Sequence, residues 1–138
     1  MPNLTPDWRA LCASGFIAAV LHGTAHAAPP TAPLLRCFAT YAGSTQVVES
    51  GVTADPYSVD AVDIGGRFTF KAVMVGTPDK VDYIKLYAYL QRRDKDIPIH
   101  QATYLPPFKA ALTPLNHLYA GDVERELQYH CILQGATP

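Results

Sequence analysis

Hydrophobic and polar residues alternate along much of the chain after residue 33, most clearly over residues 122–133. The odd positions there carry Val, Arg, Leu, Tyr, Cys and Leu, and the even positions carry Asp, Glu, Glu, Gln, His and Ile. A period of two places alternate side chains on opposite faces of a β-strand. A helix would scatter Val123, Leu127 and Tyr129 around its axis. The pattern therefore predicts a strand with Cys131 on its buried face.

The same alternation predicts further strands, separated by turn signals. Gly65-Gly66 predicts a tight hairpin, because glycine tolerates the positive φ that both turn positions require. In that hairpin we expect Asp60 opposite Lys71, and Ala61 opposite Phe70. The predicted strands cover residues 34–41, 57–64, 67–75, 81–91 and 97–105, with a shorter one at 46–49.

Proline marks the edges and the long connection of the predicted fold. Pro98 removes a backbone donor and indicates an edge strand or a bulge. Residues 106–119 contain three prolines and are predicted to form a long crossing loop, with one helical turn at 108–112. The pattern predicts an all-β fold, a two-sheet antiparallel sandwich of immunoglobulin-like architecture with six or seven strands. We expect a single domain over residues 34–138.

The first 27 residues follow a different pattern. Residues 10–21 form an uncharged, mostly apolar run, which suits a secretory signal and is shorter than the roughly 20 residues that span a bilayer. Ala25-His26-Ala27 supplies the small residues of a cleavage site. The alternative, a buried helix, is disfavoured by Gly15 and by the prolines that follow. We expect a signal peptide at 1–27, a proline-rich extension at 28–33, and a periplasmic or secreted protein.

Two cysteines, Cys37 and Cys131, remain after the expected cleavage. In an oxidising compartment, two half-buried cysteines of one small domain usually pair. The sequence therefore predicts a disulfide between the first strand and the last. Two separate buried thiols are the alternative.

Charge and composition narrow the classes of partner. The formal net charge is −1 and no run of lysine or arginine occurs, so nucleic-acid binding is not expected. No second long apolar segment follows the signal, and we expect no transmembrane segment in the mature chain. The partner is expected to be an envelope protein or a small ligand whose identity the sequence leaves open.

Familiar catalytic motifs are missing from the sequence. It has no Gly-x-Ser-x-Gly elbow, no phosphate-binding glycine loop and no dinucleotide fingerprint. His130 and Cys131 are adjacent in a strand, so their side chains point to opposite faces. We therefore expect a non-catalytic domain without a cofactor. A small hydrolase or isomerase assembled by the fold is a minor alternative.

Metal handling is the main alternative function. An accessory domain for copper or zinc would use His100, His117 and His130, if the fold brings them together. The residues after Cys131 are Ile-Leu-Gln-Gly, which lack the histidine and methionine of a blue-copper loop. Isolated surface histidines are the simpler interpretation.

The strand at 81–91 carries the most suggestive feature. Its even positions from residue 84 are apolar and predict a core face. Tyrosine combines a large, stiff apolar area with a polar tip and is enriched at binding surfaces. We therefore expect the opposite face to bind a partner protein, a glycan or an apolar ligand, unless the loop at 104–108 covers it. This candidate binding surface consists of Tyr83, Lys85, Tyr87 and Tyr89.

Overall fold

The computed structural model describes residues 31–135 and confirms the all-β prediction. The predicted signal peptide and residues 28–30 of the proline-rich extension lie outside these residues. A short 3-10 turn, η1 (Pro56–Ser58), lies between the second and third strands. The strands are β1 (Leu34–Tyr41), β2 (Ser44–Thr53), β3 (Val62–Ile64), β4 (Phe68–Thr77), β5 (Lys80–Leu90), β6 (Ile97–Tyr104), β7 (Asn116–Ala120) and β8 (Arg125–Gln134).

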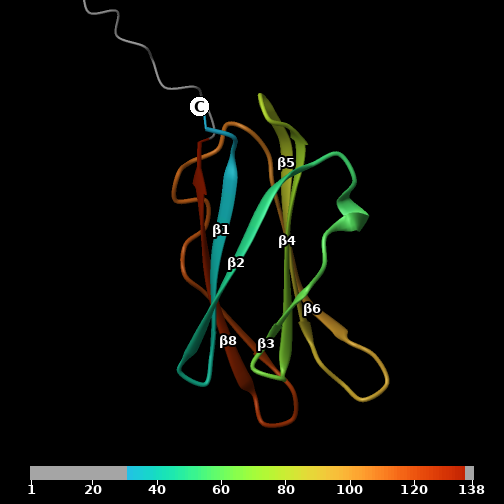
Figure 1. Ribbon diagram of the computed structural model, residues 1–138. Coiled ribbons are helices and arrows are strands. Elements are labelled where there is room, and N and C mark those ends of the chain that lie inside the picture. The colour runs from blue at the N-terminus through green and yellow to red at the C-terminus, as the bar shows by residue number, and fades with distance from the viewer. Residues whose placement is uncertain (1–30, 136–138) are drawn as a thin grey trace, which may run out of the picture.

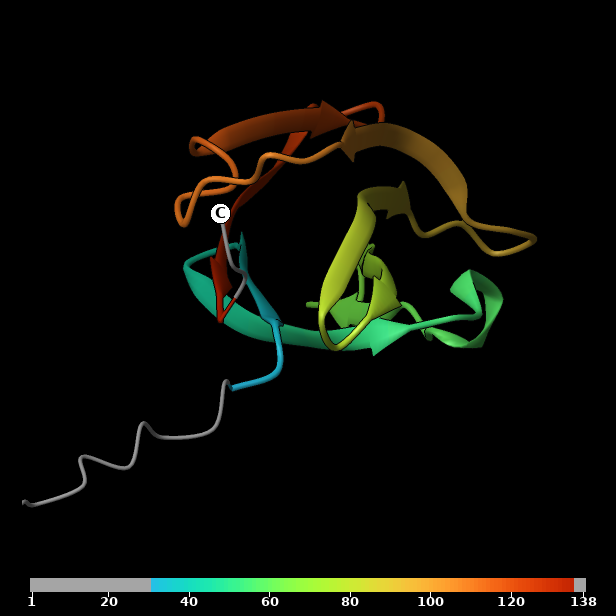
Figure 2. The ribbon, with the colours of Figure 1, turned by 90° about the horizontal axis from the view of Figure 1, so that it is seen from above.

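All eight strands belong to one mixed sheet with the order β6-β5-β4-β2-β1-β8-β7, and β3 adds to β4 (Figure 1). The sheet curls until it is nearly barrel-shaped, as the view along the strands shows (Figure 2). Its two end strands, β6 and β7, approach each other across the remaining gap. Over residues 31–135, no helix is long and apolar enough to cross a membrane.

The predicted two-sheet antiparallel sandwich of immunoglobulin-like architecture is not confirmed, and β2 is the reason. Residues 44–51 of β2 pair antiparallel with β1. The strand then continues, and Val52 and Thr53 pair in parallel with Met74 and Val75 of β4. One strand thus joins both halves into a continuous sheet. Alternation along a strand reports which face is buried and does not report the neighbouring strand.

The structure has eight strands, where six or seven were predicted. The first half of the expected strand at 57–64 does not form, because Pro56 begins the tight turn η1 and the Asp55 carboxylate accepts a hydrogen bond from the Tyr57 amide at 2.9 Å. Only β3 remains of it. In addition, β2 is longer than the predicted 46–49.

The expected loop at 106–119 contains β7, and its predicted helical turn is wrong. Residues before β7 follow the edge of β8 instead: Leu133 N donates to Ala110 O at 2.8 Å, and Thr113 N donates to Cys131 O at 3.2 Å. The prolines restrict this segment to extended conformations. An edge position requires few backbone donors, so the extended chain pairs with β8 despite its prolines.

The Gly65-Gly66 hairpin forms, but its register differs from the prediction by one residue. Both glycines have a φ of 63°. Arg67 lies outside the ladder, so Ile64 faces Phe68 and Val62 faces Phe70. Val62, not Ala61, is therefore the partner of Phe70. Asp60 was predicted to lie within this strand, but β3 begins two residues after it.

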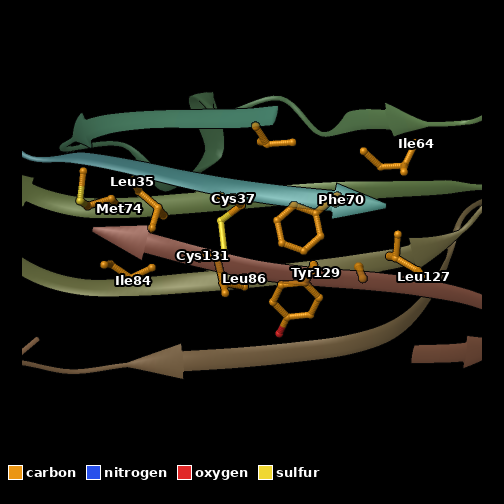
Figure 3. Packing of buried hydrophobic residues seen from close by; sticks show 14 of the residues in the cluster. Leu35, Cys37, Ile64, Phe70, Met74, Ile84, Leu86, Leu127, Tyr129 and Cys131 are labelled. Carbon is orange, nitrogen blue, oxygen red and sulfur yellow. A yellow bond between two sulfur atoms is a disulfide. The ribbon is translucent and has the colours of Figure 1, made fainter. Parts of the chain in front are cut away.

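The apolar core fills the inside of the curled sheet, and the predicted disulfide lies in it (Figure 3). Cys37 of β1 and Cys131 of β8 are bonded, fully buried and directly opposite in the ladder. The Phe70 and Tyr129 rings pack beside them with centroids 4.9 Å apart. The largest other buried side chains are Leu35, Ile64, Phe68, Met74, Ile84, Leu86 and Leu127.

Candidate functional site

Strand β5 separates the core from the candidate binding surface. Its inward residues Ile84, Leu86 and Ala88 are fully buried. Its outward residues alternate with them and are half-buried, so each keeps part of its side chain in solvent. Antiparallel ladders to β4 on one side and β6 on the other hold the strand along most of its length. The outward side chains therefore rest on rigid backbone.

The four predicted surface residues, Tyr83, Lys85, Tyr87 and Tyr89, line one hollow of about 290 Å³. Three further residues complete it. Lys71 comes from the neighbouring strand β4, and Pro56 and Tyr57 come from η1. The Tyr57 side chain is 91% exposed and forms an outer wall. We call this site the tyrosine hollow.

Local hydrogen bonds fix the wall that η1 provides. Ser58 Oγ donates to Asp55 O at 2.8 Å, and Thr53 Oγ1 donates to the same carbonyl at 3.1 Å. Val73, opposite Lys85 in the ladder, is 1% exposed although it lies outside the core cluster. The segment that carries η1 contacts β4 and covers this part of its outer face. The hollow thus lies between the sheet and a packed turn.

Within the tyrosine hollow the rings are ordered relative to one another. The Tyr87 and Tyr89 rings are nearly parallel, 15° apart, with centroids separated by 6.3 Å. Lys85 Nζ lies 5.6 Å from the Tyr83 ring centroid, within the range of a cation–π contact. Burial raises the pKa of Tyr89, with smaller contributions from Tyr87 and Asp96. Its phenol is therefore a hydrogen-bond donor at neutral pH.

The charged side chains that line the hollow have one sign. Lys71 and Lys85 are the charged residues among its lining side chains, and none of the described lining residues is a carboxylate. The site therefore favours neutral or anionic ligands over cations.

The loop that might have covered the tyrosines lies elsewhere. Tyr104 is paired with Ile84, so it lies on the core side of the sheet, and Phe108 also packs against the core. The sequence pattern did not reveal Lys71, Pro56 or Tyr57 as site residues. Asp55-Pro56 is a turn signal that would have suggested η1, but the predicted strand was placed directly after it, from residue 57.

The three histidines of the metal hypothesis have separate surroundings. His100 lies on the core side, where its Nε2 is 2.7 Å from Tyr129 Oη, and burial lowers its pKa. His117 is on the outer face, with Nδ1 2.9 Å from Glu126 Oε1. His130 stacks on Phe38, with ring centroids 4.8 Å apart. Over residues 31–135, no group of three or more His, Cys, Asp or Glu side chains is arranged to hold a metal ion.

Glu126 is the most strongly perturbed carboxylate on the outer face. Hydrogen bonds from Tyr119, Gln128 and His117, in that order of effect, lower its pKa to about 2. The carboxylate therefore stays ionised and is already surrounded by protein donors. These hydrogen bonds connect side chains of β7 and β8 on the outer face.

The tyrosine hollow thus contains all four predicted surface residues, which lie on one strand, and adds Lys71 of β4 and two residues of the η1 turn. Comparisons of the chain with protein-family models, with curated proteins and with solved structures give no match.

Proposed function

We propose that this protein is an exported, non-catalytic domain of the periplasm or the exterior that binds a saccharide chain of the envelope in the tyrosine hollow. The observation that carries the proposal is the composition of the hollow: four tyrosines and two lysines, with no carboxylate among its described lining residues.

The chemistry of the lining suits a sugar. One face of a pyranose ring consists of C–H groups, which pack against an aromatic ring, while its hydroxyls point outward. Tyrosine offers such a ring with a polar tip, and the nearly parallel Tyr87 and Tyr89 offer two in succession. The ammonium groups of Lys71 and Lys85 add hydrogen-bond donors and favour acidic sugars. A site that combines apolar faces with a few placed polar groups is typical of small-ligand recognition.

An extended peptide is a weaker candidate for the same hollow. Peptides that bind to sheets usually add a strand to a free edge. Strand β5 has no free edge along most of its length, because β4 and β6 pair with it on either side. A ligand of the hollow therefore meets side chains and not backbone.

The proposal is tested by isothermal titration of the mature protein with an alginate oligosaccharide, a polyuronate, and with a neutral cello-oligosaccharide. We expect the polyuronate to bind more tightly. Tyr89→Ser should weaken binding about fivefold or more, since interface tyrosines often contribute above about 1 kcal/mol. Lys85→Gln should reduce the preference for the acidic sugar. Val47→Ser, at an exposed position of β2, is the matched control and should bind normally.

A different outcome would favour a protein partner. If neither oligosaccharide binds, and a photo-crosslinking residue in place of Tyr57 attaches to an envelope protein, the saccharide proposal is wrong. The export part has its own test, which is the intact mass of protein isolated from the envelope fraction. We expect a chain that begins at or near Ala28, and the full 138-residue chain there would contradict export with cleavage.

A further inference from the structure

Arginines gather at one end of the sheet, where three turns meet. Arg67 lies in the β3–β4 turn, Arg92 and Arg93 in the β5–β6 turn, and Arg125 at the start of β8. These turns all lie at the lower end of the molecule in Figure 1. The other arginine among residues 31–135, Arg36, is in the middle of β1 and pairs with Glu49 at 2.6 Å.

Two adjoining hollows open between these turns. One, of about 200 Å³, is lined by Arg67, Arg92 and Arg125. The other, of about 540 Å³, is lined by Arg67, Arg92 and Arg93. They share Gln91 as well as Arg67 and Arg92. We call the combined site the arginine hollow.

The protein itself provides few anionic partners for these guanidinium groups. Arg92 Nη2 is 3.9 Å from Asp122 Oδ1, close to the limit of an ion pair. Arg125 Nη1 donates to the neutral Tyr41 hydroxyl at 2.9 Å. In the described part of the chain, Arg67 and Arg93 take part in none of the ion pairs.

A further carboxylate, that of Asp63, is bound to the amides of two residues that line the hollow. Asp63 Oδ2 accepts from Gln91 Nε2 at 2.6 Å, and Asp63 Oδ1 accepts from Gly66 N at 2.9 Å. A backbone hydrogen bond from Gln91 N to Arg67 O, 2.8 Å long, joins two of the three turns. The backbone segments that contain Arg67 and Arg92 are therefore held together by this hydrogen bond.

The lining of the arginine hollow has an excess of positive charge. Asp94 and Asp122 line it together with the four arginines. This local excess contrasts with the formal net charge of −1 of the chain. Such a concentration of one sign attracts ions of the opposite sign. Guanidinium groups also match the geometry of phosphate-type oxygens in paired hydrogen bonds.

We propose that the arginine hollow binds an oxyanionic group of the phosphate or sulfate type, independently of the tyrosine hollow. Arg67 and Arg92, which line both openings, contribute the central contacts. Arg93 and Arg125 contact the anion from either side.

The test is an amide NMR titration of the mature protein with inorganic pyrophosphate, at an ionic strength held constant with sodium chloride. We expect saturable shifts centred on Gly66, Gln91 and Arg92. Arg67→Gln and Arg92→Gln should each weaken binding about threefold to tenfold, the range of partly exposed charge pairs and paired arginine contacts. Lys80→Gln, at the exposed start of β5 at the other end of the sheet, is the control. Arg67→Lys keeps the charge and should have an intermediate affinity.

A second arm distinguishes the source of the anion. In this arm, the protein is sedimented with vesicles of phosphatidylglycerol in phosphatidylcholine and with vesicles of phosphatidylcholine alone. If a lipid headgroup is the ligand, the protein should sediment with the phosphatidylglycerol vesicles only, and this binding should depend on Arg67 and Arg92. Binding of pyrophosphate without vesicle binding indicates a soluble or saccharide-borne anion. Shifts that sodium chloride reproduces, or that are unchanged in both glutamine variants, would overturn the proposal. The pyrophosphate result is independent of saccharide binding by the tyrosine hollow, so either proposal can fail alone.

Discussion

Gly76 has the least tolerant backbone position among the glycines near the tyrosine hollow. It lies at the register shift between β4 and β5 and has a φ of 150°. A Cβ atom at this position would be 2.2 Å from Lys80 O. The backbone of the β4–β5 turn would have to move to accept it, and this turn sets the register of the tyrosine strand.

We therefore predict that Gly76→Ala lowers the free energy of unfolding by about 1–3 kcal/mol, the usual cost of a strained backbone position. Gly51→Ala is the matched control, because nothing lies within 4 Å of its Cβ position and its φ is ordinary. Urea unfolding of both variants measures the difference. Equal stability of the two variants would show that the turn adapts to a side chain.

His100 makes the stability of the core side depend on pH. Its pKa is below the ordinary value of 6.5 because burial disfavours the charged ring. The unfolded chain therefore binds a proton more readily than the folded one, and stability falls as the pH falls below about 6.5. Above that value the neutral ring keeps its contact with Tyr129 Oη.

The prediction is that His100→Gln reduces the loss of stability between pH 7.5 and pH 5.5. Chemical unfolding at both values measures it, with His130→Gln as the control, since that ring stacks on Phe38 at the outer face. The Glu126 carboxylate, with a pKa of about 2, affects stability only at lower pH. An unchanged pH dependence in His100→Gln would contradict this role of the buried ring.

At the scale of elements, the first and last strands depend on their covalent link. Cys37 and Cys131 close a loop with a sequence separation of 94. A cross-link restricts the unfolded chain, and removing a native disulfide from a small secreted domain usually costs about 2–5 kcal/mol. We expect that loss in the double variant Cys37→Ala/Cys131→Ala. Reductant should destabilise the wild type and leave the double variant unchanged, and a wild type insensitive to complete reduction would contradict the expectation.

Alternation of apolar and polar residues reports which face of a strand is buried, but not which strand lies beside it. It identified the inward and outward faces of β5 and β8 correctly, because burial on one side imposes a period of two. It did not reveal that β2 would pair with two different strands. That pairing depends on non-local contacts, to which local alternation is insensitive. It also missed β7, which is only five residues long and directly follows a proline-containing segment.

At the scale of the whole molecule, the two hollows differ in how much of them the sequence revealed. Four residues of the tyrosine hollow could be predicted, since they alternate along one strand. Its wall at Pro56 and Tyr57 became visible only through the fold. The arginine hollow was not predictable, because its side chains come from turns that are distant in sequence and are brought together by the curvature of the sheet. Neither site contains a local motif.

The curled sheet provides one rigid frame for both sites. Its interior is occupied by the disulfide and aromatic core, which leaves the outer face and the turns for the two proposed sites. We propose that the outer face of β5 is the surface that binds the saccharide.

Residue-resolved NMR of the wild-type protein during titration with the alginate oligosaccharide tests that claim most directly. We expect saturable amide and ring shifts at Tyr83, Tyr87, Tyr89 and Tyr57, the tyrosines that line the hollow. The core-side ring of Tyr129 should be unaffected. Shifts confined to other surfaces, or no shifts at millimolar sugar, would contradict it.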